Sequence, residues 1–281
     1  MHPHCAGVGW RWRGAMPYAK VRDINMYYEV HGKGFPLVMI MGLGANAYWW
    51  DPFLIDEFSK KFRVVVFDNR GAGRTDKPKV EYTMKMFADD TVGLMDHLGI
   101  GKAHILGVSM GGMIAQEIAL NYPDRVERLI LCVTAPGGQV TVPPKPEAMA
   151  LLTIDRSKLT DEQIARETLK VLYPEEFIKD HPEVAEATVE RISKHVMSAD
   201  AFMRQLNAIM KFNAYDRLGS IKIPTLVVSG GKDILVPPEN GRLIAEKIPN
   251  AKLVIFDNSG HGLITQERDR FAKLVMGFLL K

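Results

Sequence analysis

Ser109 stands at the centre of the sequence Gly-Val-Ser-Met-Gly, which matches the pattern G-x-S-x-G of serine nucleophiles. A continuous apolar run, residues 103–108, precedes it, and a segment with helical spacing of apolar residues, residues 110–120, follows. This context predicts a sharp turn from a strand into a helix, with glycines that let the neighbouring backbone approach the serine. The chemistry indicated is attack of a hydroxyl oxygen on a carbonyl carbon.

The serine needs a general base, because a hydroxyl is a weak nucleophile on its own. His261 is the one histidine placed after the last apolar run, and it lies between two glycines. Asp233 follows the apolar run of residues 225–228, which brings it to the carboxyl edge of a parallel sheet. We predict Ser109 as nucleophile, His261 as base and Asp233 as the acid that orients the imidazole.

Two other aspartates compete for the role of the acid. Asp257 lies only shortly before His261, on the following strand. Asp68 ends the apolar run of residues 62–67 and is expected to stabilise the turn at residues 69–74. Asp233 is preferred because its strand ends where the histidine must arrive.

An oxyanion needs preorganised hydrogen-bond donors. The N–H of Met110, directly after the nucleophile, is one candidate, and the loop after the apolar run of residues 36–41 supplies the other. Glycines in that loop allow a turn, so the N–H of Leu43 is the predicted second donor.

The remaining chain alternates between buried strands and helices, which predicts an α/β fold with a doubly wound, mostly parallel sheet. The predicted strands are residues 36–41, 62–67, 103–108, 126–133, 225–228 and 253–256, with a hairpin within 21–30. The predicted helices are residues 84–98, 110–120, 239–248 and 268–280.

One long segment breaks this alternation. Residues 143–218 carry no strand signal and read as helices separated by Tyr173-Pro174 and His181-Pro182. We predict a helical lid at 143–218, inserted into a core made of residues 16–142 and 219–281. Residues 1–15 are expected to form a disordered leader, without the apolar region of a secretory signal.

The sequence resembles the α/β-hydrolase superfamily from about residue 18 to residue 281. The resemblance rests on the loop 41–44, the turn 68–74, the segment 107–112, Gly231-Lys232-Asp233 with Val236-Pro237, and Gly260-His261. Within the superfamily the sequence is similar to the carboxylesterase, enol-lactonase and cofactor-free haloperoxidase-like group. It departs from many members at Met41, where they carry histidine, and Ser109 argues against the members that use an aspartate nucleophile.

The resemblance implies hydrolysis of carboxylic esters through an acyl-enzyme, and the apolar side chains expected in the pocket favour acyl groups that are apolar and of short-to-medium length. The alternatives are a lactonase of enol-lactone type, a carbon–carbon bond hydrolase, and a slow-turnover ligand-binding receptor. The predicted substrate pocket consists of Tyr48, Trp49, Trp50, Met203 and Met210, although the two methionines could instead pack the lid onto the sheet. The lid has nearly balanced charge, which does not indicate a strongly anionic substrate.

The composition of the chain argues against two kinds of partner, nucleic acid and the membrane interior. The net charge of +3 is too small to favour nucleic acid, and no apolar stretch reaches the ~18 residues of a membrane span. Cys132 lies in an apolar run and is expected to be a small buried hydrophobe, which fits a reducing cytoplasm. We predict a cytoplasmic enzyme with a small-molecule ester substrate and no metal or cofactor; the sequence does not indicate an oligomeric state.

Overall fold

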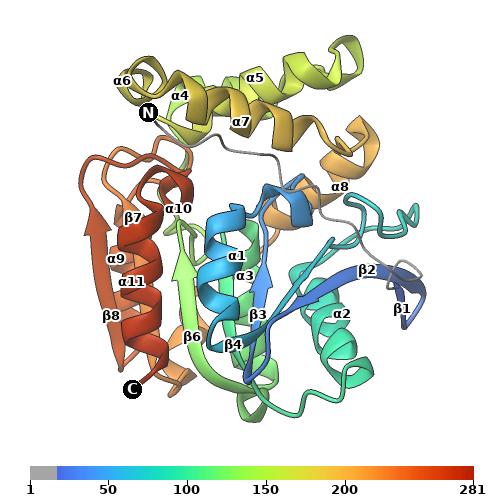
Figure 1. Cartoon of the computed structure of the whole chain (residues 1–281), viewed down its shortest axis with the longest axis vertical. Helices are drawn as coiled ribbons and strands as arrows, with labels where there is room; N and C mark the ends of the chain where they lie inside the picture. Colours follow the sequence, from blue (N-terminus) through green and yellow to red (C-terminus); the bar gives the residue numbers. More distant parts are fainter. Residues whose placement is uncertain (1–17) are drawn as a thin grey trace, which may run out of the picture.

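The structure, a computed structural model, describes residues 18–281, so the predicted leader at residues 1–15 lies outside the described part. Eight strands form one sheet at the centre of the molecule (Figure 1). They are β1 (Tyr18–Val21), β2 (Ile24–His31), β3 (Phe35–Ile40), β4 (Phe62–Phe67), β5 (Ala103–Val108), β6 (Val126–Cys132), β7 (Thr225–Gly230) and β8 (Ala251–Phe256).

The sheet has the strand order β1-β2-β4-β3-β5-β6-β7-β8. The hairpin of β1 and β2 is antiparallel, β2 pairs antiparallel with β4, and all other neighbours are parallel. Every residue of β5 and of β7 is buried, as expected for strands covered on both faces. The predicted mostly parallel α/β sheet is confirmed, and its carboxyl edge gathers the ends of β3, β5 and β7.

Helices cover both faces of the sheet (Figure 1). One face carries α2 (Met84–His97), α3 (Met110–Asn121) and α9 (Glu239–Lys247), and the other carries α1 (Pro52–Ser59), α10 (Leu263–Gln266) and α11 (Arg268–Leu279). Helix α1 was not predicted, although its start has a clear signal. Asp51 accepts a hydrogen bond from the N–H of Phe53, and Pro52 occupies the first helical position.

A group of helices lies over the carboxyl ends of the strands, at the top of Figure 1. They are α4 (Pro146–Leu152), α5 (Asp161–Leu172), α6 (Glu175–Asp180), α7 (Pro182–Ser193) and α8 (Ala199–Met210). Four short 3₁₀ turns complete the described chain: η1 (Ala47–Trp49), η2 (Pro123–Arg125), η3 (Arg156–Lys158) and η4 (Tyr215–Ser220). Helices thus fill the segment predicted as a lid; the division into core and lid stays a prediction.

Between residues 18 and 281, no helix combines the length and the apolar character needed to cross a bilayer. The cytoplasmic location stays a prediction.

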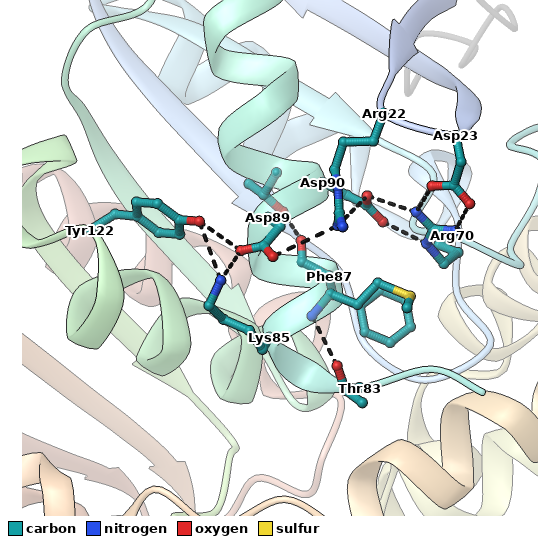
Figure 2. A network of polar contacts seen from close by, with 11 residues as sticks. Arg22, Asp23, Arg70, Thr83, Lys85, Phe87, Asp89, Asp90 and Tyr122 are labelled. Carbon is teal, nitrogen blue, oxygen red and sulfur yellow. Dashed lines mark hydrogen bonds and ion pairs between the residues drawn. The ribbon is translucent and has the colours of Figure 1, made fainter. Parts of the chain in front are cut away.

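A buried ion pair ties the turn after β4 to α2 (Figure 2). Arg70 donates to Asp90 from Nε and Nη2 at 2.7 and 2.8 Å, and to Asp23 from Nη1 and Nη2 at 2.9 and 2.7 Å. The side chains of Arg70 and Asp90 are each only 1% exposed. Arg70 therefore connects the turn after β4 to α2 in the interior, where an unpaired charge is costly, and to the exposed Asp23 of the β1–β2 turn.

We expect Asp90→Ala to lower the free energy of unfolding by ~3–5 kcal/mol, because it removes one partner of a buried guanidinium. Urea denaturation measures the change. Asp89→Ala is the matched control: Asp89 is 21% exposed and pairs with Lys85 at the surface, so its loss should cost less than ~1 kcal/mol. Equal losses of unfolding free energy at the two positions would show that the buried Arg70–Asp90 pair stabilises the fold no more than an ion pair at the surface.

Candidate active site

Ser109 occupies the turn between β5 and α3, where its backbone has φ 58° and ψ −121°. Positive φ is strained for a residue with a side chain, so the surroundings must hold it. A Cβ at Gly107 would lie 2.2 Å from the carbonyl oxygen of Gly111. A Cβ at Gly111 would lie 2.1 Å from the carbonyl oxygen of Ile40. The two glycines therefore permit the close approach of α3 to β5 and β3 that forms the turn.

Asp233 and His261 form a buried pair, with Oδ2 of Asp233 2.7 Å from Nδ1 of His261. The other carboxylate oxygen, Oδ1, accepts hydrogen bonds from the N–H groups of Leu235 and Val236 at 2.9 and 2.8 Å. These two bonds fix the carboxylate so that Oδ2 faces the imidazole. Because Oδ2 is an acceptor, Nδ1 carries the proton and Nε2 is left as the basic nitrogen.

The two competing aspartates have other surroundings. Asp68 is buried and accepts from the N–H of Ala47 at 2.7 Å and from the N–H and Nε of Arg74 at 2.8 and 3.0 Å. Asp68 thus connects the loop after β3 to the turn after β4, as expected for a residue that stabilises this turn. Asp257 is exposed, on the loop after β8. Neither is hydrogen-bonded to His261, whose carboxylate partner within the described residues is Asp233.

The loop after β3 runs directly over Ser109. A Cβ at Gly42 would lie 2.9 Å from Cβ and 3.4 Å from Oγ of Ser109. Within residues 18–281, the N–H of Leu43 has no acceptor. Met110 is the first residue of α3, and N–H groups in a first turn have no partner inside the helix. The loop and the helix start thus offer two free donors beside the serine, as an oxyanion requires.

Gln205 of helix α8 holds this loop in place. It is fully buried; its Oε1 accepts from the N–H of Gly44 at 3.0 Å, and its Nε2 donates to the carbonyl oxygen of Arg70 at 2.9 Å. A helix from the segment predicted as a lid therefore helps to shape the loop that carries Leu43. Sequence reasoning missed Gln205, because its partners are 161 and 135 residues away along the chain.

Ser109 and His261 line one cavity of about 120 Å³, together with Leu43. Much of its wall is apolar and comes from α4, α5 and the chain between them: Leu151, Leu152, Ile154, Ile164, Val171 and Leu172. The volume is somewhat below the ~150 Å³ of an engineered apolar cavity that binds benzene.

The predicted pocket residues need correction at helix α8. Trp49 does line the cavity, whereas Met203 and Met210 do not. The two methionines are 46% and 70% exposed, so they are neither cavity wall nor packing. The buried face of α8 includes Phe202 and Gln205 instead, and Phe202 lines the cavity. The apolar spacing in the sequence predicted Met203 on the inward face of α8, whereas the residue directly before it, Phe202, is buried there.

The predicted aromatic wall also differs from the observed one. Tyr48 lies outside the cavity, where its ring stacks on that of His195 at 5.7 Å and faces the guanidinium of Arg74 at 4.4 Å. Trp50 is 2% exposed and belongs to the core under α1 and α11. Neither residue lines the cavity, so Trp49 alone among the three consecutive aromatic residues reaches it.

Cys132 is fully buried at the end of β6, which confirms the expectation of a small buried hydrophobe. Burial raises the pKa of its thiol, so it is not a reactive thiolate. Within residues 18–281, His, Cys, Asp and Glu side chains form no group of three that could hold a metal ion.

Residues 36–267 match the family model described as alpha/beta hydrolase fold. The chain is 33% identical over 244 residues to a poly(3-hydroxyalkanoate) depolymerase of Ectopseudomonas oleovorans, covering 87% of this chain and 84% of that protein. It is 28% identical over 263 residues to a provisionally named carbamate hydrolase, RutD, of Azorhizobium caulinodans, covering 94% and 98%. The solved enol-lactonase of Burkholderia xenovorans LB400 has a TM-score of 0.81 and 31% identity, covering 94% of this chain and all of that one (100%).

Proposed function

We propose that this chain, which belongs to the α/β-hydrolase family, is a serine hydrolase that cleaves carboxylic esters of short-to-medium apolar acyl groups through an acyl-enzyme. The observation that carries the proposal is the 2.7 Å contact between Asp233 and His261, in a cavity that Ser109 also lines. Ser109 is the nucleophile, His261 the general base and Asp233 the acid that orients the imidazole.

In the acylation step, Oγ of Ser109 attacks the ester carbonyl carbon while its proton passes to Nε2 of His261. The N–H groups of Leu43 and Met110 stabilise the oxygen that becomes negative. The carbon–oxygen bond to the alcohol then breaks, and the leaving alkoxide takes the proton from His261. Asp233 stabilises the imidazolium that exists between these two proton transfers.

Deacylation repeats the same steps with water in place of the serine. His261 removes a proton from the water, the hydroxide adds to the acyl carbon, and the bond to Oγ of Ser109 breaks. The proton returns to Ser109, and the carboxylic acid leaves. Both halves use the same base and the same oxyanion donors, so the reaction needs no further group from the chain.

A lactone is the second candidate substrate, because the site can open a cyclic ester by the same steps. The similarity to an enol-lactonase over 94% of this chain favours it. In a lactone the leaving alkoxide stays attached to the acyl group, so the whole product must fit the cavity before deacylation.

The test is a series of p-nitrophenyl esters with acyl groups from acetate to palmitate. We expect kcat/KM to be highest for the short and medium acyl groups and to fall at least ~5-fold for the longest one, since forcing extra methylenes into a packed wall costs ~1–3 kcal/mol. Release of p-nitrophenolate measures the rates. Absence of turnover across the whole series, with opening of a five-membered lactone, would favour the second candidate; absence of both would refute an ester or lactone hydrolase.

A further inference from the structure

Three charged side chains besides His261 line the cavity: Arg156, Glu167 and Arg191. Glu167 accepts from Nζ of Lys170 at 2.7 Å. Arg191 lies 3.4 Å from a carboxylate oxygen of Asp51. Arg156 differs from both, because no carboxylate in residues 18–281 pairs with it.

Arg156 belongs to η3, and its guanidinium stacks on the ring of Phe202, with Cζ 3.7 Å from the ring centroid. Its Nε is buried without a hydrogen-bond partner. Burial lowers the pKa of Arg156 to about 10, so the side chain stays cationic at neutral pH. A half-buried cation with an unsatisfied N–H is costly unless another group supplies the partner.

The stacking on Phe202 occupies one face of the guanidinium plane and none of its N–H groups. Phe202 covers one face of the plane, whereas the N–H groups point outward along its edges. Those edges are the positions from which arginine binds a carboxylate through two parallel hydrogen bonds. Arg191 lines the same cavity and adds a second cation to its wall.

This subsite lies close to the reacting centre. The ring of Phe202 separates Arg156 from the loop that carries Leu43, since a Cβ at Gly44 would lie 3.3 Å from Cδ2 of Phe202. One aromatic ring therefore stands between the guanidinium and the oxyanion loop. Arg156 and Ser109 line the same cavity.

We propose that Arg156 forms a carboxylate-binding subsite, so that among esters or lactones of equal acyl length the enzyme prefers those whose otherwise apolar acyl chain ends in a carboxylate. This substrate class rests on the proposed serine hydrolase function. The nearly balanced charge of residues 143–218 gives no hint of it, because the preference arises from one unpaired arginine and not from the sum of the charges.

The test compares two esters of equal length, p-nitrophenyl hemi-adipate, which ends in a carboxylate, and p-nitrophenyl hexanoate, which ends in a methyl group. The quantity measured is the ratio of their kcat/KM values, after subtraction of spontaneous hydrolysis. We expect Arg156→Met to lower this ratio at least ~10-fold, because a hydrogen bond to a charged group is lost. Arg156→Lys should keep part of the preference, since it keeps the charge.

Arg166→Met is the matched control. It removes the same charge from helix α5, but Arg166 is exposed and paired with Glu162 and Glu186, so the ratio should not change. A wild-type enzyme that cleaves both esters with a ratio that Arg156→Met leaves unchanged would overturn the subsite and leave the esterase function standing.

A binding measurement separates the subsite from the proposed catalysis. Monomethyl adipate is titrated into Ser109→Ala with and without Arg156→Met, and calorimetry gives the two Kd values. A Kd at least ~10-fold weaker in the double variant supports the subsite even if neither ester is turned over. Equal Kd values refute it, whatever the enzyme does to neutral esters.

Discussion

Ser109→Ala should lower kcat for a short p-nitrophenyl ester by ~10⁶-fold, because the variant has no atom that can form the acyl-enzyme. The backbone turn already accommodates a Cβ at φ 58°, so alanine adds no strain. Some rate above that in water should persist, because the donors at Leu43 and Met110 are intact. The loss is measured as steady-state release of p-nitrophenolate, together with the disappearance of any initial burst.

The control for this variant is Ser220→Ala, at an exposed serine in η4 whose hydroxyl donates to the carbonyl oxygen of Arg217. It should leave kcat unchanged. Thermal unfolding of both variants should match the wild type to within the effect of a surface change, ~0.5 kcal/mol. Retention of more than about one hundredth of the wild-type kcat by Ser109→Ala would show that another group is the nucleophile.

The parts of the molecule with local signals could be predicted from the sequence. Each strand from β3 to β8 contains a short apolar run, and the turn at Ser109 is flanked by glycines that the packing of α3 requires. Parallel strands send their carboxyl ends to one edge, so chain order was enough to bring Asp233 and His261 toward Ser109. The structure places the first two 2.7 Å apart.

The features that depend on long-range contacts could not be predicted. Gln205 bonds the loop at Gly44, and nothing near it in the sequence marks that role. The face of α8 that turns inward depends on how the helix packs, and periodicity chose Met203 where Phe202 is buried. The same holds for Arg156, since only the fold shows which of the arginines in the segment 143–218 lacks a carboxylate.

The second large effect is expected for Asp233→Asn, which should lower kcat by ~10⁴-fold while the fold stays intact. Oδ1 of Asp233 accepts two hydrogen bonds, from the N–H groups of Leu235 and Val236. In the variant, the amide oxygen must keep this position, because an amide NH₂ group there would face two donors. The NH₂ group is therefore directed at Nδ1 of His261.

This orientation reverses the direction of the hydrogen bond to the imidazole. In the wild type Nδ1 donates to Asp233, whereas in the variant it must accept from the amide, so the proton moves to Nε2. A protonated Nε2 cannot take the proton of Ser109, and the base is lost without any change in shape. Steady-state kcat measures the loss, and unfolding in urea checks that the fold is kept.

Asp257→Asn is the matched control, since it makes the same chemical change at the competing acid. Asp257 is exposed and His261 pairs with Asp233, so kcat should stay at the wild-type value. A large loss in Asp257→Asn with a small one in Asp233→Asn would assign the acid to the loop after β8 instead of the loop after β7. Small losses of kcat of comparable size in both variants would mean that another group sets the tautomer of His261. The hydrogen bonds that Oδ1 accepts from Leu235 and Val236 would then not decide which nitrogen of His261 carries the proton.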